Sequence, residues 1–173
     1  MFQVGEYIVC DHNGVCKILD ITEMPELKKG VLYYQMEPIY SKGSRIFVPV
    51  DSTKLVMRKV STEEETMALI DEIPEIETMW IVNEKKREEQ YREVARKYDC
   101  REWVKIIKTI YLRKKSRRLE GKKITYIDEK YMKMAEDNLY GEISLPLNLS
   151  PDEVEKFIRE KIGDGEKNKA GAP

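Results

Sequence analysis

The sequence has 173 residues, of which 36% are charged and 41% hydrophobic, and its formal net charge is −1. This composition is typical of a globular, helix-rich protein of one or two small domains, and no run of about 18 apolar residues is present that could cross a membrane. The N-terminal residues show no basic stretch followed by an apolar one, so we expect no signal peptide. The three cysteines are therefore expected to be reduced thiols of a cytoplasmic protein.

Residues 1–60 have the alternating pattern and the turn residues of short β-strands. Strands are expected near residues 7–10, 15–21, 31–36, 45–50 and 55–57. The first two are joined at Asn13-Gly14, a pair that tolerates positive φ and favours a hairpin, and Lys28 to Gly30 mark the next turn. Pro49 has no N–H to donate, which places it near a strand end or on a sheet edge. Five short strands at this spacing predict a small, strongly bent barrel.

After Val60 the apolar pattern changes to the helical period. Ser61 to Glu64 form a capping box that begins the first expected helix, and Pro74 ends that helix. Further helices are expected over residues 83–97, from Asp99 to Gly121, from Thr125, and from Ser150-Pro151. A frayed tail is expected from residue 163 onward. The predicted fold class is therefore α+β, with a β-barrel followed by an all-α unit of about five helices.

The low net charge conceals two segments of opposite sign. Residues 61–79 contain seven acids and no Lys or Arg, whereas residues 105–123 contain nine bases and a single acid, Glu120. Local charge matters more than net charge for attracting a polyanion. Two interpretations are compatible with this pattern: two solvated helix faces that pair with each other, or a surface for nucleic acid.

The two tryptophans lie in different settings. Trp103 belongs to an apolar helical stripe, so we expect it in the core. The other members of that stripe are Ile106, Ile107, Ile110 and Tyr111. Trp80 instead ends an acidic connection, directly before a basic helical stretch. Either it packs on a later residue and staples that helix, or it is exposed and contacts nucleic acid.

Neither a metal site nor an active site is indicated. Cys10, His12 and Cys16 cluster around the first hairpin, but a structural zinc site needs four ligands and no second pair is present, so we expect the thiols to pack as small apolar groups. The single histidine lies in an expected turn, and no phosphate-binding, dinucleotide-binding or nucleophile motif occurs. We therefore expect no enzyme activity, no cofactor, no metal and no small-molecule substrate.

Several segments, taken in order, resemble the CarD/CdnL family of transcription regulators, whose N-terminal module also occurs in the bacterial transcription-repair coupling factor. The resemblance extends from residue 2 to about residue 162. The matching segments are Phe2 to Val9, Asn13 to Ile18, Ile46-Phe47-Val48-Pro49-Val50, Trp80, Trp103 to Lys115, and Asp128 to Glu142.

The resemblance implies a division of labour. Residues 1–60 would be a Tudor-like (SH3-like) barrel that binds the β subunit of bacterial RNA polymerase, with contacts from Arg45, Ile46 and Phe47. Residues 61–163 would contact promoter DNA at the upstream edge of the transcription bubble, through the minor groove and phosphates and without reading sequence. Residues 164–173 would be a flexible tail.

The resemblance also assigns roles to single residues. Trp80 corresponds to the family tryptophan, which wedges into the minor groove and stabilises the open complex. DNA backbone contacts are expected from Lys85, Lys86, Arg87, Arg113, Lys114, Lys115, Arg117 and Arg118. The sequence departs from the family at two places. Many members carry basic residues where this chain has Val82 and Asn83, and some carry Arg where it has Phe47.

The expected function is that of a non-enzymatic regulator of transcription initiation in the bacterial cytoplasm, associated with the nucleoid through RNA polymerase. One alternative is a protein–protein adaptor of polymerase without DNA contact, which a buried Trp80 would favour. Another is a stand-alone basic DNA-binding protein, which would require tight duplex binding in the absence of polymerase.

Overall fold

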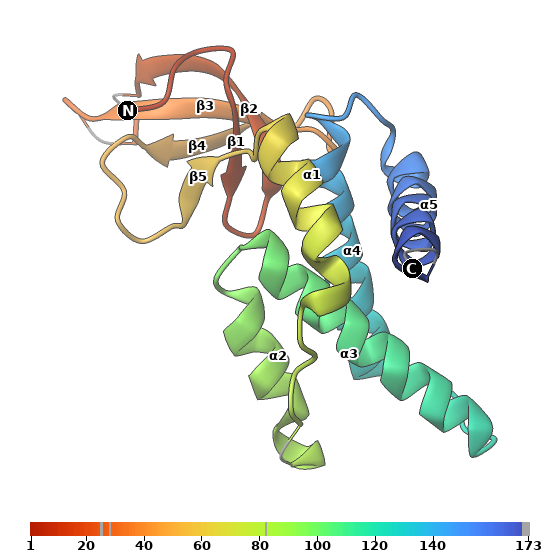
Figure 1. The fold of residues 1–173 in the computed structure, drawn as a ribbon. Coiled ribbons are helices and arrows are strands. Elements are labelled where there is room, and N and C mark those ends of the chain that lie inside the picture. The colour runs from red at the N-terminus through yellow and green to blue at the C-terminus, as the bar shows by residue number, and fades with distance from the viewer. Residues whose placement is uncertain (25, 28, 82, 171–173) are drawn as a thin grey trace. The chain divides into compact units, whose positions relative to one another are not determined.

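The computed structural model describes residues 1–24, 26, 27, 29–81 and 83–170, and side chains up to residue 163. The chain divides into two compact units, with the boundary between Val60 and Ser61. The first unit is a β-sheet and the second is helical, in the order expected from the sequence (Figure 1).

The first unit is one five-stranded antiparallel sheet with the strand order β4-β3-β2-β1-β5. Its strands are β1 (Tyr7–Cys10), β2 (Gly14–Glu23), β3 (Leu32–Pro38), β4 (Ile46–Pro49) and β5 (Met57–Lys59). A register shift between Ile18 and Asp20 interrupts the β2–β3 ladder, and an irregularity of this kind increases the local bend of a sheet. Strand β5 begins at Met57, the residue at which the sequence pattern predicts that the last strand ends.

Alternate residues of the strands form the core of this unit. That core consists of Ile8, Cys10, Cys16, Ile18, Tyr34, Met36 and Val48. Burial, reinforced by the nearby Cys10, raises the pKa of the Cys16 thiol to about 12. Both strand thiols are therefore protonated and pack as small apolar groups, as expected from the sequence.

The first hairpin is present, but its turn is not the predicted Asn-Gly turn. Cys10 pairs with Gly14, which leaves residues 11–13 as the loop. The residues with positive φ are His12 (61°) and Gly14 (67°), and Asn13 is not among them. The Asn13 N–H donates instead to the Cys10 carbonyl at 3.1 Å. At the next predicted turn Gly30 has φ 77°, while Lys28 lies outside the described residues.

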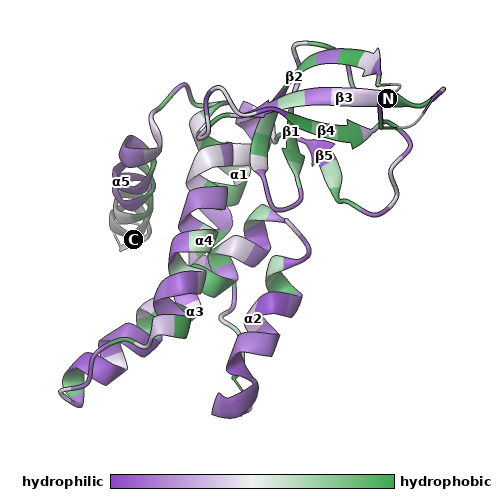
Figure 2. Ribbon diagram, turned by 180° about the vertical axis from the view of Figure 1, so that it is seen from behind, coloured by the Kyte–Doolittle hydropathy of each residue, from purple (hydrophilic) through white to green (hydrophobic). Residues whose placement is uncertain are grey.

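The second unit contains five α-helices and two short 3-10 helices among the described residues. They are α1 (Glu63–Glu72), η1 (Ile73–Glu75), η2 (Glu84–Lys86), α2 (Arg87–Ala95), α3 (Cys100–Leu119), α4 (Tyr126–Ser144) and α5 (Pro151–Ala170). Helix α3 packs against α2 and α4, and α4 packs against α5. The helices are coloured mainly as hydrophilic, with shorter hydrophobic stretches between (Figure 2). Helix α5 continues to Ala170, beyond the residue at which we expected a tail to begin.

The first helix cap is displaced by one residue from the predicted position. Thr62, not Ser61, is the N-cap, and its side chain and that of Glu65 form the capping box. Ser61 instead donates its N–H (3.0 Å) and its hydroxyl (2.8 Å) to the buried Glu142 of α4. The sequence pattern predicted Ser61 as the N-cap, but Ser61 makes a tertiary contact with Glu142 instead.

Trp103 lies in the core of the helical unit, as predicted. Its side chain is 2% exposed and meets the Tyr98 ring edge-on, with the ring centroids 5.8 Å apart. Ile106 and Ile110 are buried with it. Two members of the predicted stripe differ, because Ile107 is only partly buried and Tyr111 is exposed. The buried stripe of α3 is therefore narrower than its apolar pattern.

Candidate nucleic-acid and polymerase interfaces

Trp80 lies in the connection between η1 and η2, and its side chain is 83% exposed. The staple interpretation required this ring to pack on a neighbouring helix, and its exposure disagrees with that interpretation. Contact of the ring with nucleic acid stays a prediction. An exposed indole ring offers a large apolar area that a partner surface could bury. Asn83, one of the two family departures, caps η2 through its side chain, whereas Val82 lies outside the described residues.

The main chain that carries Trp80 is held on both sides of the ring. The Met79 N–H donates to the Thr109 hydroxyl at 2.8 Å, and Gln90 Nε2 donates to the Trp80 carbonyl at 3.1 Å. Lys108 donates to the carbonyls of Ile73 (2.8 Å) and Pro74 (3.1 Å) in η1, and also to the carbonyl of Ile76, where the connection begins. All of these bonds use main-chain groups of η1 or of the connection, so they restrain the backbone and leave the indole free.

Replacing Thr109 with Val is expected to loosen the Trp80 connection without unfolding the helical unit. The substitution keeps the volume of a buried side chain but removes the acceptor of the Met79 N–H, a loss of about 1–3 kcal/mol. In a Trp103→Phe background, the fluorescence anisotropy of Trp80 should fall. Thr78→Val is the matched control, because Thr78 is exposed in the same connection. Equal anisotropy in both variants would show that Thr109 does not restrain the ring.

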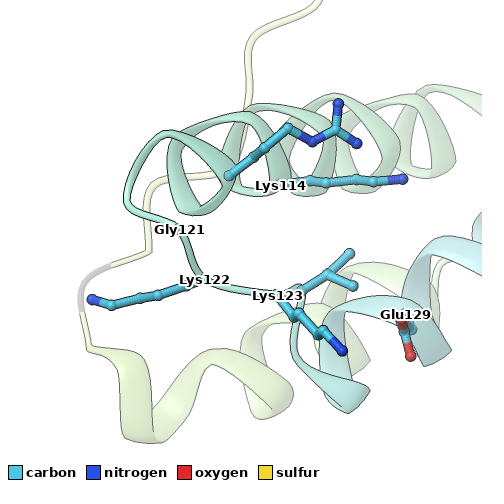
Figure 3. A pocket seen from close by; sticks show the side chains of 7 residues that line it. Lys114, Gly121, Lys122, Lys123 and Glu129 are labelled. Carbon is cyan, nitrogen blue, oxygen red and sulfur yellow. The ribbon is translucent and has the colours of Figure 1, made fainter.

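Five of the eight predicted phosphate-contacting bases are exposed and make no ion pair within the described part of the chain. They are Lys85, Lys86, Lys114, Lys115 and Arg118. Arg117 is partly buried, and its Nε donates to the Lys123 carbonyl at 2.8 Å. Lys114 and Arg118 border a hollow at the end of α3 (Figure 3).

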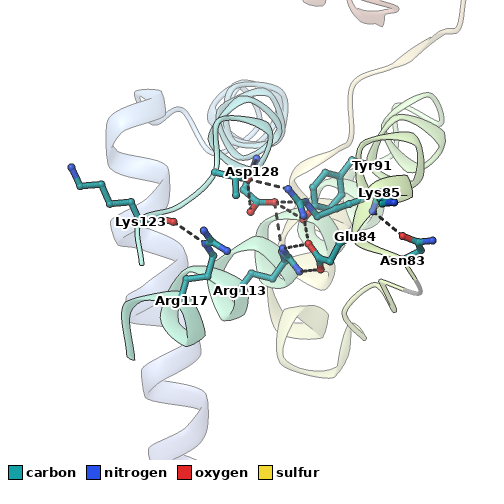
Figure 4. A network of polar contacts seen from close by, with 10 residues as sticks. Asn83, Glu84, Lys85, Tyr91, Arg113, Arg117, Lys123 and Asp128 are labelled. Carbon is teal, nitrogen blue, oxygen red and sulfur yellow. Dashed lines mark hydrogen bonds and ion pairs between the residues drawn. The ribbon is translucent and has the colours of Figure 1, made fainter. Parts of the chain in front are cut away.

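The other two predicted contacts, Arg87 and Arg113, lie in a polar network inside the helical unit (Figure 4). Arg113 forms a two-pronged pair with Glu84, with distances of 2.8 and 2.9 Å. Arg87 also bonds to Glu84, and its Nε lies 3.1 Å from Oδ1 of Asp128. The Arg113 hydrogen bond, with the charges of both arginines, lowers the pKa of Glu84 despite some burial. Both guanidinium groups therefore form ion pairs with Glu84 and Asp128 within the helical unit.

Asp128 is the centre of that network and is fully buried. It accepts hydrogen bonds from the Tyr91 hydroxyl at 3.0 Å and from the Thr125 hydroxyl at 2.9 Å. Burial, and then the Asp128 carboxylate, raise the pKa of Tyr91 well above its usual value. The network therefore ties α2, α3 and α4 together next to the Trp80 connection. Nothing in the local sequence pattern distinguished its arginines from the solvent-exposed bases.

The predicted polymerase contact lies on an end strand, because β4 stands at one end of the sheet order. The Val50 N–H donates to the Leu32 carbonyl at 2.9 Å, and hydrogen-bonded and non-bonded residues alternate along an antiparallel pair. Phe47 and Pro49 therefore direct their main-chain groups to the open edge. Pro49 has no N–H, so Phe47 offers both a donor and an acceptor there.

The three predicted polymerase-binding residues differ in their surroundings. Ile46 packs against the core of the β unit, so its side chain contributes to folding. Arg45 pairs with Glu37 at 2.6 Å, and Glu37 also accepts from the Gly43 N–H at 2.8 Å. The Gly43 bond, followed by that from Arg45, lowers the pKa of Glu37. Phe47 is partly exposed and is the member of the trio with main-chain groups at the edge.

Metal and membrane features can be assessed over the described residues. Within them, no group of three His, Cys, Asp or Glu side chains is placed to hold a metal ion. His12 is largely exposed, and its Nε2 lies 3.1 Å from Asp11. No helix in this part of the chain has the length and apolar character needed to span a membrane.

The chain thus combines a small bent β unit that has an open edge strand with a helical unit that carries an exposed tryptophan and exposed bases. Residues 2–61 match the family described as the CarD-like/TRCF RID domain. The match confirms the predicted resemblance over these residues, and with it the Tudor-like class of the β unit, whereas the resemblance of residues 62 to about 162 stays a prediction. The match indicates a transcription-related protein that interacts with RNA polymerase. The chain has no significant match among curated proteins.

Proposed function

We propose that this protein is a non-enzymatic regulator of transcription initiation. The β unit binds the β subunit of RNA polymerase, and the helical unit contacts promoter DNA at the upstream edge of the bubble and stabilises the open complex. The observation that carries the proposal is the 83% exposed Trp80 on a restrained main chain, in a protein whose first unit is a CarD-like/TRCF RID domain. The overall test is the half-life of competitor-resistant promoter complexes, which the protein should lengthen.

The open edge of β4 supports the polymerase contact. A strand of the partner that pairs with this edge would bond to the main chain of Phe47, and alternate side chains would supply specificity. The opposite end of the sheet is β5, where the Asp11 N–H donates to the Val56 carbonyl at 2.9 Å. By the same alternation, Lys59 directs its main chain outward there. The sheet therefore contains a matched position at each edge.

Phe47→Pro is expected to weaken binding to the polymerase β subunit by about tenfold or more. Proline removes an N–H that the sheet itself does not use, and an unmatched partner carbonyl costs about 1–3 kcal/mol. Lys59→Pro, at the other edge, should bind normally. Affinity is measured with the isolated β subunit, and circular dichroism checks the fold. Equal affinity of the two folded variants would refute docking through β4.

Exposed cations in the helical unit support the DNA contact. Lys85 and Lys86 follow Trp80 closely, and Lys114, Lys115 and Arg118 lie near the end of α3. Such groups bind phosphates without reading sequence. Affinity for free DNA should be weak, because polymerase supplies the effective concentration. The adaptor alternative called for a buried Trp80, and the exposed ring favours DNA contact over it.

A further inference from the structure

Helix α3 has more apolar surface than the fold buries. Ile107 is only partly buried, and the side chains of Tyr111 and Leu112 are each 52% exposed. These three residues belong to one wall of a groove of about 390 Å³ that lies over α4, between α3 and α5. Ile158 and Ile162 of α5 belong to the opposite wall. The groove shares no lining residue with the hollow at the end of α3.

The floor of the groove is a row of α4 side chains spaced one helical turn apart, Met132, Glu136 and Tyr140. The row from residue 132 to residue 140 is about 12 Å long, which is roughly two turns of an α-helix. Helix α4 packs against α3 and against α5, so the three helices surround the groove. A further helix laid along it would contact α3, α4 and α5 together, as in a helix bundle, and would cover their exposed apolar side chains.

The groove contains a carboxylate, that of Glu136, which makes no hydrogen bond or ion pair with the described residues. Burial, and then the charge of Glu155, raise the pKa of Glu136. The cations that line the groove already have partners. Arg159 pairs with Glu155 at 2.7 Å, and Lys108 donates to main-chain carbonyls in and after η1. The groove therefore offers apolar walls and an unpaired negative charge in the middle of its floor.

Tyr140 follows Glu136 by one turn on the same face of α4, and its hydroxyl makes no hydrogen bond with the described residues. Burial, and then the charge of Glu136, raise the pKa of Tyr140 well above its usual value. A guanidinium group can donate two parallel bonds to a carboxylate and has further N–H groups for a hydroxyl. A basic side chain with apolar neighbours one turn away on each side therefore matches the floor in shape and in charge.

We propose that this groove binds an amphipathic α-helix of a protein partner. That helix carries large apolar side chains at positions i and i+7 and a basic residue, best an arginine, at i+3 or i+4, where it pairs with Glu136. The chain's own C-terminal residues do not fit, because residues 163–173 contain no Leu, Ile, Val, Met or aromatic residue. The inference goes beyond the proposed function, since it involves neither DNA nor the open edge of the β unit.

The first test is a selection from a displayed library of helical peptides, randomised at positions i, i+3, i+4 and i+7, against the full chain. Enriched peptides should have large apolar residues at i and i+7 and Lys or Arg at an inner position. With Glu136→Lys as the target, Asp or Glu should be enriched there instead. Asp137→Lys, an exposed position outside the groove, should retain the basic choice. Failure to enrich a helix, or the same inner charge with all three targets, would overturn the inference.

An enriched peptide, made synthetically, then tests the wall of the groove. Leu112→Glu should weaken its binding by at least about tenfold, because the new charge would be buried against an apolar partner. Leu119→Glu is the matched control, since Leu119 is on the same helix, is 84% exposed and lies outside the groove. Circular dichroism checks that both variants fold. Trp80→Ala should bind the peptide like the wild type. Equal weakening by the two leucine variants would refute binding in the groove.

Photo-crosslinking in cells identifies the natural occupant. With p-benzoylphenylalanine in place of Tyr111, the crosslinked peptide should have the selected pattern, and Glu136→Lys should abolish that product. The same reagent in place of Leu119 should not give it. Crosslinks from position 111 to the chain itself, with a dimer that Leu112→Glu dissociates, would assign the groove to a second copy and refute the proposal. Crosslinked peptides without the pattern, or binding of tetraphenylphosphonium when no helix is enriched, would refute it as well.

Discussion

Replacing Trp80 with Ala should shorten the lifetime of polymerase open complexes by at least about tenfold while leaving the melting temperature unchanged. A wedge at an unstacked base step offsets an unstacking cost of about a few kcal/mol, and each 1.4 kcal/mol changes a rate by about tenfold. The free energy of unfolding should not change, because the side chain is 83% exposed. The bonds from Met79 and to the Trp80 carbonyl are made by the main chain and survive the substitution.

The measurement pairs thermal melting with the half-life of competitor-resistant promoter complexes. Trp103→Ala is the contrasting variant, since Trp103 is buried and its truncation should cost about 3–5 kcal/mol of stability. If Trp80→Ala instead lowers the melting temperature strongly and leaves the kinetics per folded molecule unchanged, Trp80 is a structural residue. The DNA wedge would then be ruled out.

The second large effect is expected at Asp128. Asp128→Ala should lower the free energy of unfolding of the helical unit by about 3–5 kcal/mol, because it leaves the buried Arg87 guanidinium without that carboxylate. The Tyr91 and Thr125 hydroxyls lose their acceptor in the same step. The α2–α3–α4 junction beside the Trp80 connection would therefore loosen.

Urea denaturation of the full chain, followed by helical circular dichroism, measures this loss. Asp137→Ala is the matched control on the same helix, since Asp137 pairs with Lys133 at an exposed site and its loss should change stability by no more than about 0.5 kcal/mol. Similar unfolding curves for the two variants would show that the buried network contributes little. Asp128→Asn should fall between them, because an amide retains some hydrogen bonding but no charge.

The sequence predicted best where the determining forces are local. The apolar run over residues 7–10 and the segment 15–21 after Asn13-Gly14 predicted the first two strands, which the structure has at Tyr7–Cys10 and Gly14–Glu23. The Ser150-Pro151 start predicted α5, where Ser150 and Glu153 form hydrogen bonds. The predicted helix start was wrong by one residue where a side chain distant in sequence forms a hydrogen bond. Ser61 bonds to Glu142 of α4, and the cap passed to Thr62.

The sequence by itself therefore determined the order of strands and helices, the buried position of Trp103 and the family of the first unit, since each depends on periodicity or on a contiguous motif. Only the tertiary structure decided which charges are available to a partner. Arg113 and Lys114 are neighbours in the chain, yet one faces Glu84 and the other borders the hollow. Tyr91 and Asp128 are 37 residues apart and meet only in the folded unit. A base that the local sequence would place in solvent can form an ion pair with a carboxylate of another helix, and it is then not available to a partner. Ion pairing depends on distance in space, which the local sequence does not show.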